Sequence, residues 1–524
     1  MREQSDRFYI KAAWALIIGF SIFRIFYAGL FNLVPDETNY WQWSRHLAFG
    51  YHDQAPLIAW AIRLTTMLFG HTEIGVRLPS VLAAFIASVY LMTIAKRWFG
   101  AHAAWITAMV SQGTLIVNVG ALLATPDGLQ AAAWAAAGYH VACAYERDSW
   151  GQWILSGLWF GFGLLSKYTM IIFPPGVFLY GLLNPIHRHR LKSPRPYVGL
   201  LVGLLLFCPV IIWNEQNNWN SVRHVAYLGG ANQAFAIHLK YIGEFIGSQA
   251  ALLSPLAFIL VLLAWHEAFR RIVQKDNWIY GYLFFTSFPM FAGFAVLSLH
   301  TRVYGNWPAA GYLTTAVLIA ALFTRASRIS AANRVLRAGR SLWPWAVGTS
   351  YLFSALLLIQ VVWPVFPVPI HLDRTATEIL GWKELGVAAH QIKNTMSNPE
   401  KTFLFGLRYQ TASELAFYTP DQSQTVSINK WKRPNVYDYW WNDKDLMGWD
   451  AVGATYHPNS HKIMLNQIFE RVDPPEPLKI FRRRVFSPDH AEKEYVKTLY
   501  LYRAYGFKGG LRWVPPNSSD IRAN

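Results

Sequence analysis

Long apolar runs, separated by short polar connections, fill most of the sequence between residues 12 and 363 and limit what this chain can fold into. A helix needs about 20 mostly apolar residues to cross a hydrocarbon core of about 30 Å. Runs that approach or reach this length lie at residues 12–30, 76–95, 102–119, 127–145, 151–166, 169–184, 197–213, 241–265, 278–299, 305–323 and 343–363. The first run has no small-residue cleavage site and is expected to remain as a helix. The sequence therefore predicts an α-helical polytopic membrane protein with about eleven transmembrane helices.

The composition points to the same class. Hydrophobic residues make up 53% of the chain and charged residues only 15%, whereas soluble proteins carry about 25% charged residues. The net charge of +17, from 47 Lys and Arg against 30 Asp and Glu, would favour nucleic acid only if it were clustered on a soluble surface. Most of this charge lies between apolar runs, so we expect no nucleic-acid partner.

Basic residues mark alternate connections between the apolar runs. They are Arg2, Arg7, Lys11, Lys96, Arg97, Arg147, Arg188, Arg190, Lys192, Arg195, Arg270, Arg271, Lys275, Arg325, Arg328, Arg334, Arg337 and Arg340. The positive-inside rule places these connections in the cytoplasm. An odd number of spans then leaves the following on the outer, periplasmic side: residues 31–75, Asp127, Lys167, residues 214–240, Arg302 and residues 365–524.

The chain after residue 364 has a different pattern. Helices are expected at residues 377–396 and 410–418, and strands at residues 402–407, 425–429, 451–456, 478–485 and 498–505. Strands that alternate with helices predict a small periplasmic α/β domain at residues 365–524, after a transmembrane domain at residues 1–364. The aromatic stretch at residues 437–449 suits a sugar-binding surface, a membrane interface or a packed loop.

The first outer loop, residues 31–75, is too apolar for a free loop. Its segments at residues 37–48 and 56–69 are too short to span a membrane, so we expect two helices lying in the interface. Trp41, Trp43 and Trp60 are then expected at headgroup depth.

Charged residues recur at the outer ends of the spans. Asp36, Glu37, Asp53 and Asp127 are acids, and a carboxylate at a membrane boundary is costly unless it is paired. Asp36 and Asp127 each follow a proline, so helix capping explains them equally well.

The cations near the spans have two explanations as well. Lys167 lies between two spans, Arg302 lies in an outer connection, and Arg24 lies within the first span. Each side chain could extend to the headgroups or hold a phosphate. Together, acids and cations on one face at the depth of a lipid phosphate predict a site for a phosphorylated lipid.

Several segments carry a resemblance to a known family. They are PDETNYWQWSRHLAFGYHDQAPLIAWAIRLTTMLFGHTEIGVRLPS, GALLATPDGLQ, LLSKYTM, PVIIWNEQNNW and RVYGNWPAAGYL, and RYQTASELAFYTP in the C-terminal part. In order and spacing they resemble the bacterial members of the dolichyl-phosphate-mannose-protein mannosyltransferase-like superfamily. These are GT-C glycosyltransferases that include the aminoarabinose and galacturonic acid transferases of lipid A. The resemblance covers most of residues 20–320.

The resemblance implies transfer of a sugar from a polyprenyl phosphate to an envelope acceptor, such as lipid A, another glycan or a protein. It implies a multi-pass protein of the bacterial inner membrane with its active site facing the periplasm. Asp36 matches the catalytic base, with Glu37 beside it, and Asp127 matches a further acid.

The substrate-binding residues that follow from the resemblance include Asp53, Tyr40 and His52. Asp53 falls where the aminoarabinose transferases carry a metal-associated glutamate followed by a donor-binding lysine. Gln54 replaces that lysine here, so a cationic contact must come from Lys167, Arg302 or Arg24.

The expected chemistry needs few residues. A lipid phosphate leaves as a stable anion, so cations replace a general acid. One base removes the acceptor proton, which predicts inversion at the anomeric carbon. No dense metal-ligand motif is present, although His52 and Asp53 are possible ligands of a divalent metal.

Two other functions remain open from the sequence. A transporter or flippase would also place charged residues in spans, but its site is expected near the bilayer midplane. A membrane anchor for an outer sensor domain is the third possibility, although it does not explain the charged outer loop.

Overall fold

The computed structural model describes residues 2–324, 333–428, 434–458, 462–483 and 493–511. The predicted cytoplasmic residues Arg325 and Arg328 lie outside these ranges, as do the ends of two predicted strands at residues 429 and 484–485. The chain forms two compact units. The helical unit comprises Met1–Tyr27, Gln54–Ile58 and Arg77–Leu357, and the sheet unit comprises Ala28–Asp53, Ala59–Val76 and Leu358–Asn524.

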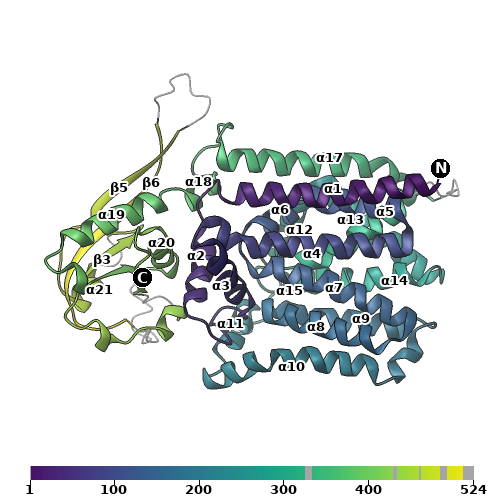
Figure 1. The fold of residues 1–524 in the computed structure, drawn as a ribbon, viewed down its shortest axis with the longest axis horizontal. Helices are drawn as coiled ribbons and strands as arrows, with labels where there is room; N and C mark the ends of the chain where they lie inside the picture. The colour runs from purple at the N-terminus through teal and green to yellow at the C-terminus, as the bar shows by residue number, and fades with distance from the viewer. Residues whose placement is uncertain (1, 325–332, 429–433, 459–461, 484–492, 512–524) are drawn as a thin grey trace. The chain divides into compact units, whose positions relative to one another are not determined.

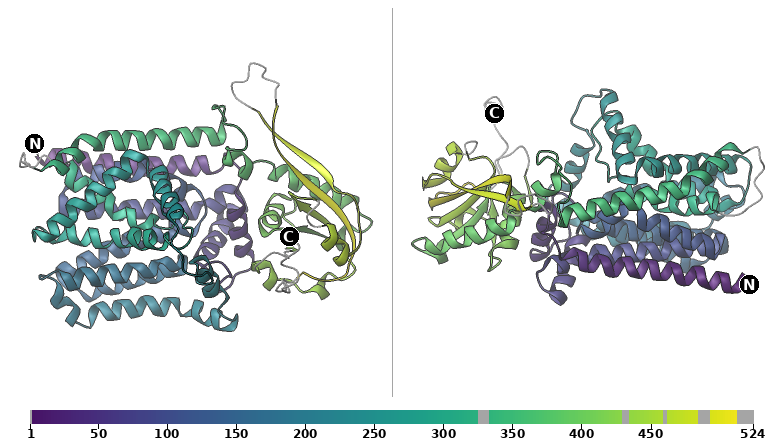
Figure 2. Two further views of the ribbon diagram at one scale, coloured as in Figure 1. Left: turned by 180° about the vertical axis from the view of Figure 1, so that it is seen from behind. Right: turned by 90° about the horizontal axis from the view of Figure 1, so that it is seen from above.

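The long helices of the helical unit run roughly along one common direction (Figures 1 and 2). Five are long and apolar enough to cross a membrane: α1 (Arg2–Ala28), α4 (Glu73–Phe99), α10 (Arg195–Gln216), α14 and α15 together (Trp278–Leu297), and α17 (Arg334–Val362). Two bent pairs raise the number to seven. They are α5 (Ala101–Gly113) with α6 (Leu115–Leu122), bent by 70°, and α12 (Leu239–Leu253) with α13 (Pro255–Val273), bent by 105°.

The remaining predicted runs also form helices, but these are short or less apolar. They are α7 (Pro126–Arg147), α8 (Trp150–Ser166), α9 (Phe173–Leu183) and α16 (Leu313–Phe323). Among the described residues, five to seven candidate spans therefore stand against the expected eleven. The helical membrane architecture is confirmed, and the larger number of spans stays a prediction.

Helices α8 and α10 pack through glycines. A Cβ at Gly157 would lie 2.0 Å from the carbonyl oxygen of Gly199, and one at Gly203 would lie 2.7 Å from the carbonyl oxygen of Gly157. Gly161 repeats the small side chain one turn after Gly157. Small residues four apart let two helix backbones approach closely, which is a common packing mode inside membranes.

The sheet unit contains a six-stranded mixed sheet. Its strands are β1 (Thr402–Gly406), β2 (Thr425–Ser427), β3 (Asp450–Thr455), β4 (Phe469–Val472), β5 (Glu476–Arg483) and β6 (Lys493–Phe507). The order is β2-β1-β3-β6-β4, with β5 also paired to β6. Figure 1 labels β3, β5 and β6. β1 runs parallel to β2 and β3, whereas β6 is antiparallel to its partners.

Most C-terminal elements agree with the predicted ones, including helix α20 (Tyr409–Tyr418), but two differences have physical causes. The predicted helix at residues 377–396 is wrong as one element, because α18 (Arg374–Ile379) and α19 (Trp382–Thr395) are separated at Gly381, whose φ is +93°. Strand β4 and helix α21 (Lys462–Ile468) were not predicted, since both are too short to show a clear periodicity.

Apart from Gln54–Ile58, which belong to the helical unit, the first outer loop folds as part of the sheet unit. Helices α2 (Pro35–Arg45) and α3 (Leu57–Phe69) confirm the two predicted short helices. Trp41 and Trp43 are both buried inside the protein, and their depth relative to the headgroups stays a prediction. Trp41 packs edge-on against Phe417 of α20, and Trp43 stacks on Tyr51. The division at residue 364 and the interfacial position of α2 and α3 stay predictions.

Candidate functional site

The N-terminus of α2 presents two adjacent acids in different surroundings. Pro35 and Asp36 open the helix, and the Asp36 side chain is exposed where the helix dipole favours negative charge. Glu37 is buried, and its Oε2 accepts a hydrogen bond of 3.0 Å from the Val34 N–H. Tyr40 lies one turn after Asp36 on the same face, with its ring edge-on to Trp43. Glu37 thus caps the helix, while the Asp36 side chain is exposed.

His52 and Asp53 lie between α2 and α3. His52 is buried, Asp53 is half-buried, and His52 Nε2 lies 4.0 Å from Asp53 Oδ1. Two donors at this separation fit two positions around one divalent cation, where each ligand lies about 2.0–2.2 Å from the metal. A histidine nitrogen together with a carboxylate oxygen suits zinc and similar cations.

The helical unit brings together two predicted residues, Asp127 and Lys167. Asp127 is in the first turn of α7, and Lys167 directly follows α8. Lys167 Nζ lies 2.8 Å from Asp127 Oδ1, and the Lys167 side chain is only 7% exposed. Asn306 donates a further hydrogen bond of 3.2 Å to the same oxygen. We call Asp127, Lys167 and Asn306 the rim cluster.

Neutral hydrogen bonds hold the backbone on both sides of the rim cluster. Ser166 Oγ donates to the Pro126 carbonyl at 2.6 Å, which ties the end of α8 to the start of α7. Tyr168, next to Lys167, bonds Ser221 of α11 (Asn220–Leu228) at 3.0 Å, and Ser221 in turn donates to Asn214 at 2.7 Å. These short contacts fix the depth and direction of the Lys167 ammonium group.

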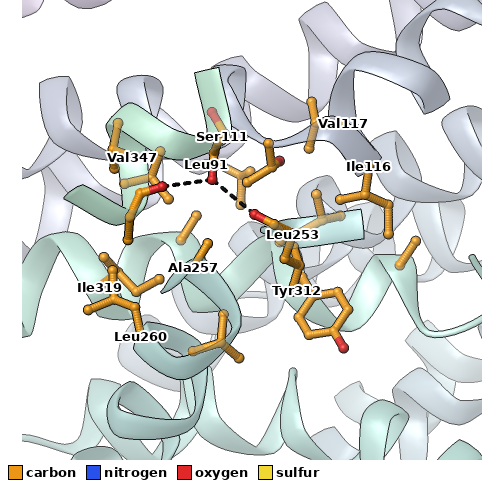
Figure 3. A pocket seen from close by; sticks show the side chains of 18 residues that line it. Leu91, Ser111, Ile116, Val117, Leu253, Ala257, Leu260, Tyr312, Ile319 and Val347 are labelled. Atoms are coloured by element: carbon orange, nitrogen blue, oxygen red, sulfur yellow. Dashed lines mark hydrogen bonds between the residues drawn. The ribbon is translucent and has the colours of Figure 1, made fainter. Parts of the chain in front are cut away.

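A cavity of about 240 Å³ begins at Asp127 and Asn306 and continues between α4, α6, α7 and α16. Apart from Ser88, Ser111 and Thr125, its inner wall is formed by apolar side chains and glycines. A smaller cavity of about 50 Å³ shares Leu91, Ile116 and Leu313 with it. Figure 3 shows Leu91, Ile116 and Val117 around this smaller cavity. An apolar space with a charged rim fits an amphipathic ligand.

The two arginines proposed as phosphate contacts lie elsewhere in the helical unit. Arg302 is 72% exposed, and its Nε lies 3.0 Å from Glu244 Oε2. Arg24 is 1% exposed, and its two terminal nitrogens donate to Gln112 and Asn118. Arg302 is therefore open to an anion, whereas the terminal nitrogens of Arg24 are engaged by protein oxygens.

Asn306 is the site residue that the sequence analysis missed. It stands in the motif RVYGNWP, four residues after Arg302. In the sequence, this motif indicated a site only through the cation Arg302. Nothing in a single sequence indicates that the Asn306 amide contacts Asp127.

The sequence matches known proteins over parts of its length. Residues 53–213 match the family described as dolichyl-phosphate-mannose-protein mannosyltransferase. The chain is 26% identical over 311 residues to the lipid A galacturonosyltransferase RgtD of Rhizobium johnstonii, which covers 59% of this chain and 64% of RgtD. It is 22% identical over 291 residues to the undecaprenyl phosphate-alpha-4-amino-4-deoxy-L-arabinose arabinosyl transferase of Serratia proteamaculans, covering 50% and 52%. The matches thus span about half to two thirds of these relatives.

Solved structures establish the fold. ArnT from Cupriavidus metallidurans bound to undecaprenyl phosphate aligns with a TM-score of 0.59 at 16% identity, over 94% of this chain and 97% of ArnT. The archaeal oligosaccharyltransferase AglB from Archaeoglobus fulgidus aligns with a TM-score of 0.52 at 10% identity, over 84% and 69%. The chain is therefore a multi-pass membrane protein with an ArnT-like fold, and its residues 53–213 resemble the dolichyl-phosphate-mannose-protein mannosyltransferase family.

Proposed function

We propose that this protein is an inverting glycosyltransferase that uses a polyprenyl-phosphate-linked sugar as donor. Its acceptor is an envelope molecule on the periplasmic face of the bacterial inner membrane. Among the acceptors, lipid A is favoured over another glycan or a protein, because RgtD and the aminoarabinose transferase are the matched relatives. The undecaprenyl phosphate named in the ArnT structure supports the donor class.

The rim cluster at the mouth of the apolar cavity is the observation that carries this proposal. Lys167 has three N–H donors and gives one of them to Asp127 at 2.8 Å. A phosphate oxygen can receive another, while the hydrocarbon chain enters the cavity of about 240 Å³ beside Asp127. A water-soluble sugar nucleotide has no hydrocarbon chain for such a cavity. The exposed Arg302 is proposed as a second cation for the donor.

The proposed chemistry assigns one role to each polar group. The acceptor oxygen attacks the anomeric carbon, and the bond from that carbon to the phosphate oxygen breaks with its electron pair going to the phosphate. Asp36 takes the acceptor proton, because its carboxylate is exposed at the start of α2. Tyr40 contacts the sugar, since flat aromatic rings pack well against sugar faces. Glu37 keeps the first turn of α2 in place.

A divalent metal is a further part of the proposal. Asp53 and His52 would hold it, because their donor atoms are 4.0 Å apart and of suitable type. A bound cation would supply positive charge to an anionic donor, which is the contribution that Gln54 cannot make. Metal analysis of the purified protein, with Asp53→Asn as the comparison, tests this directly. Equal metal content in both proteins would contradict it.

Transfer assays with the purified full-length protein test the function. Undecaprenyl phosphates carrying aminoarabinose or galacturonic acid are offered with lipid A, and products are followed by mass spectrometry. We expect release of undecaprenyl phosphate and a glycosylated lipid A with inverted configuration. Envelope glycolipids from cells with and without the protein should differ by the same sugar. Movement of the intact lipid-linked sugar across vesicles, without transfer, would instead establish the transporter alternative.

A further inference from the structure

Arg24 is a buried cation inside the first apolar helix, with neutral partners. Its Nη1 donates to Gln112 Oε1 at 2.7 Å, and its Nη2 donates to Asn118 Oδ1 at 2.8 Å. No carboxylate among the described residues forms an ion pair with it. A charge inside a membrane span is costly and commonly marks a functional role. Two amide oxygens stabilise it without cancelling its charge.

The two partners of Arg24 lie on opposite sides of a helix break. Gln112 is in the last turn of α5 and Asn118 is in α6, and the 70° bend lies between them at Thr114. Asn118 Nδ2 also donates to the carbonyls of Gln112, at 2.9 Å, and Thr114, at 3.1 Å. Backbone carbonyls freed by a helix break inside a membrane must find such donors. Arg24 therefore holds both halves of the broken helix at once.

A fourth helix, α4, joins this network. Gln112 Nε2 donates to Ser88 Oγ of α4 at 2.7 Å. The contacts of Arg24 thus connect α1, α4, α5 and α6 through side chains that are all nearly fully buried. These side chains are buried from water. Loss of the guanidinium would therefore leave the side-chain oxygens of Gln112 and Asn118 without the hydrogen bonds that Arg24 donates to them.

The shorter half of the broken helix forms a wall of the large cavity. Ile116, Val117, Val119, Gly120 and Ala121 of α6 all line it. A Cβ built on Gly120 meets no atom within 4 Å, so this position faces open space. The direction that α6 takes after the bend consequently decides the width of the cavity.

We propose that Arg24 is a positioning residue that fixes α6 relative to α5 and so shapes the cavity that receives the hydrocarbon chain of the lipid donor. The inference rests on the proposed function for the identity of the ligand. The rim cluster binds the phosphate end, and the Arg24 network sets the space for the chain. Arg24 acts through Gln112 and Asn118 and does not touch the phosphate.

The first test compares two probes, undecaprenyl phosphate and the short geranyl phosphate, by binding to the full-length protein. In Arg24→Met we expect binding of undecaprenyl phosphate to weaken about 10-fold, the equivalent of about one hydrogen bond. Geranyl phosphate should bind as it does to the unchanged protein. Arg24→Lys should be intermediate, because one nitrogen replaces two. Ser21→Ala is the matched control, since its hydroxyl bonds only the Ile17 carbonyl of the same helix.

An unchanged preference for the long chain in Arg24→Met would overturn the proposal. The proposal would also be overturned if binding of both phosphates fell in proportion to the amount of folded protein. That result would indicate a purely structural role for Arg24. If the unchanged protein binds neither phosphate, the proposed function fails, and a second measurement still decides the role of Arg24.

That second measurement uses a nitroxide on Gly120→Cys, in a background with Cys143→Ala and Cys208→Ala. The label faces the cavity, so its spectrum reports how firmly α6 is held. We expect greater label mobility after Arg24→Met and no change after Ser21→Ala. Identical spectra for the Arg24 variant and the unchanged protein would contradict the proposed role.

Discussion

Asp36 and Glu37 are neighbours in the sequence, but their surroundings separate their roles. The Asp36 carboxylate is exposed in the first turn of α2, whereas Glu37 is buried and bonded to the Val34 N–H. Adjacent acids in unlike environments often divide chemical and structural work. The pair therefore offers its own control, because the same change from acid to amide can be made at both positions.

We expect Asp36→Asn to lower the rate of sugar transfer at least about 100-fold, the low end for loss of a general base. Glu37→Gln should keep most of the rate and lower the stability by about 1 kcal/mol, as other lost helix caps do. Transfer rate and thermal unfolding in detergent measure the two effects. Full transfer activity in Asp36→Asn would exclude Asp36 as the general base.

Lys167 and Asp127 give a prediction about donor binding. Lys167→Ala removes the ammonium group but leaves Asp127 with the Asn306 hydrogen bond of 3.2 Å. We expect the KM for the lipid donor to rise about 30-fold, since a charge-assisted hydrogen bond contributes about 2 kcal/mol. The KM for the acceptor should stay the same.

Asn306→Ala is the control for Lys167→Ala, because it removes a neutral contact to the same oxygen. Its effect on donor KM should be several-fold smaller, since a neutral hydrogen bond is weaker than a charge-assisted one. Equal donor KM values for Lys167→Ala and the unchanged protein would exclude Lys167 as a phosphate contact.

At the scale of elements, apolar length predicted where helices occur but not where they break. The run at residues 102–119 is continuous in hydrophobicity, yet it bends by 70° at Thr114. The two halves of this broken helix share hydrogen bonds with distant side chains, Arg24 among them, which no local pattern contains. In the same way Trp41 and Trp43 matched an interfacial pattern, which did not indicate their contacts with Phe417 of α20 and with Tyr51.

The candidate site shows the same limit. Asp127 and Lys167 stood out in the sequence as charges at the ends of apolar runs. Their ion pair of 2.8 Å depends on how α7 and α8 pack, and the contact of Asn306 depends on a loop nearly 180 positions away. Residue type and spacing therefore predicted which residues belong to the candidate site, whereas tertiary packing determined which of them contact one another.

An ion network connects the end of α17 to β5 within the sheet unit. Arg482 of β5 lies 2.5 Å from Asp373 and 2.8 Å from Glu494, and Gln360 at the end of α17 donates to Asp373. Burial alone would raise the pKa of Asp373. Hydrogen bonds from Thr375 and Arg482, with the Ala376 N–H and Gln360, outweigh burial and hold that pKa below its ordinary value of 3.8.

We expect Arg482→Met to destabilise the protein by about 3–5 kcal/mol, because it leaves Asp373 buried without its cation. The stabilising contribution of the Asp373 carboxylate is present above pH 3.8 and is lost as the pH falls through the lowered pKa. In Arg482→Met this loss should be smaller and complete at a higher pH, because without the arginine the pKa of Asp373 is lowered less. Hydrogen exchange of β5 and β6 between pH 3 and 7 measures this.

Arg503→Met is the control for the Arg482 change, because its ion pair with Glu476 is partly exposed on the neighbouring strand. An exposed pair contributes little, so its unfolding profile should resemble that of the unchanged protein. Equal destabilisation by the two variants would show that burial of the Arg482 pair has no special effect.

At the scale of the whole molecule, the number of spans decides which loops face the periplasm. Five, seven or eleven spans are all odd, so each places the two termini on opposite sides of the membrane. The internal loops differ. Eleven spans keep both the loop before α10 and the loop before α14 in the cytoplasm. Seven spans place both loops outside, whereas five place only the loop before α14 outside.

Cysteine labelling in intact cells separates these arrangements. His189→Cys reports the loop before α10, Gln274→Cys reports the loop before α14, and Asn442→Cys reports the sheet unit. All three positions are exposed, and changing these residues leaves every arginine and lysine in place.

In a Cys143→Ala, Cys208→Ala background, we expect an impermeant maleimide to label Asn442→Cys at once. His189→Cys and Gln274→Cys should react only after the membrane is permeabilised, because the basic residues beside them favour the cytoplasm. Labelling of both from outside would indicate seven spans, labelling of Gln274→Cys alone would indicate five, and protection of Asn442→Cys would invert the proposed orientation.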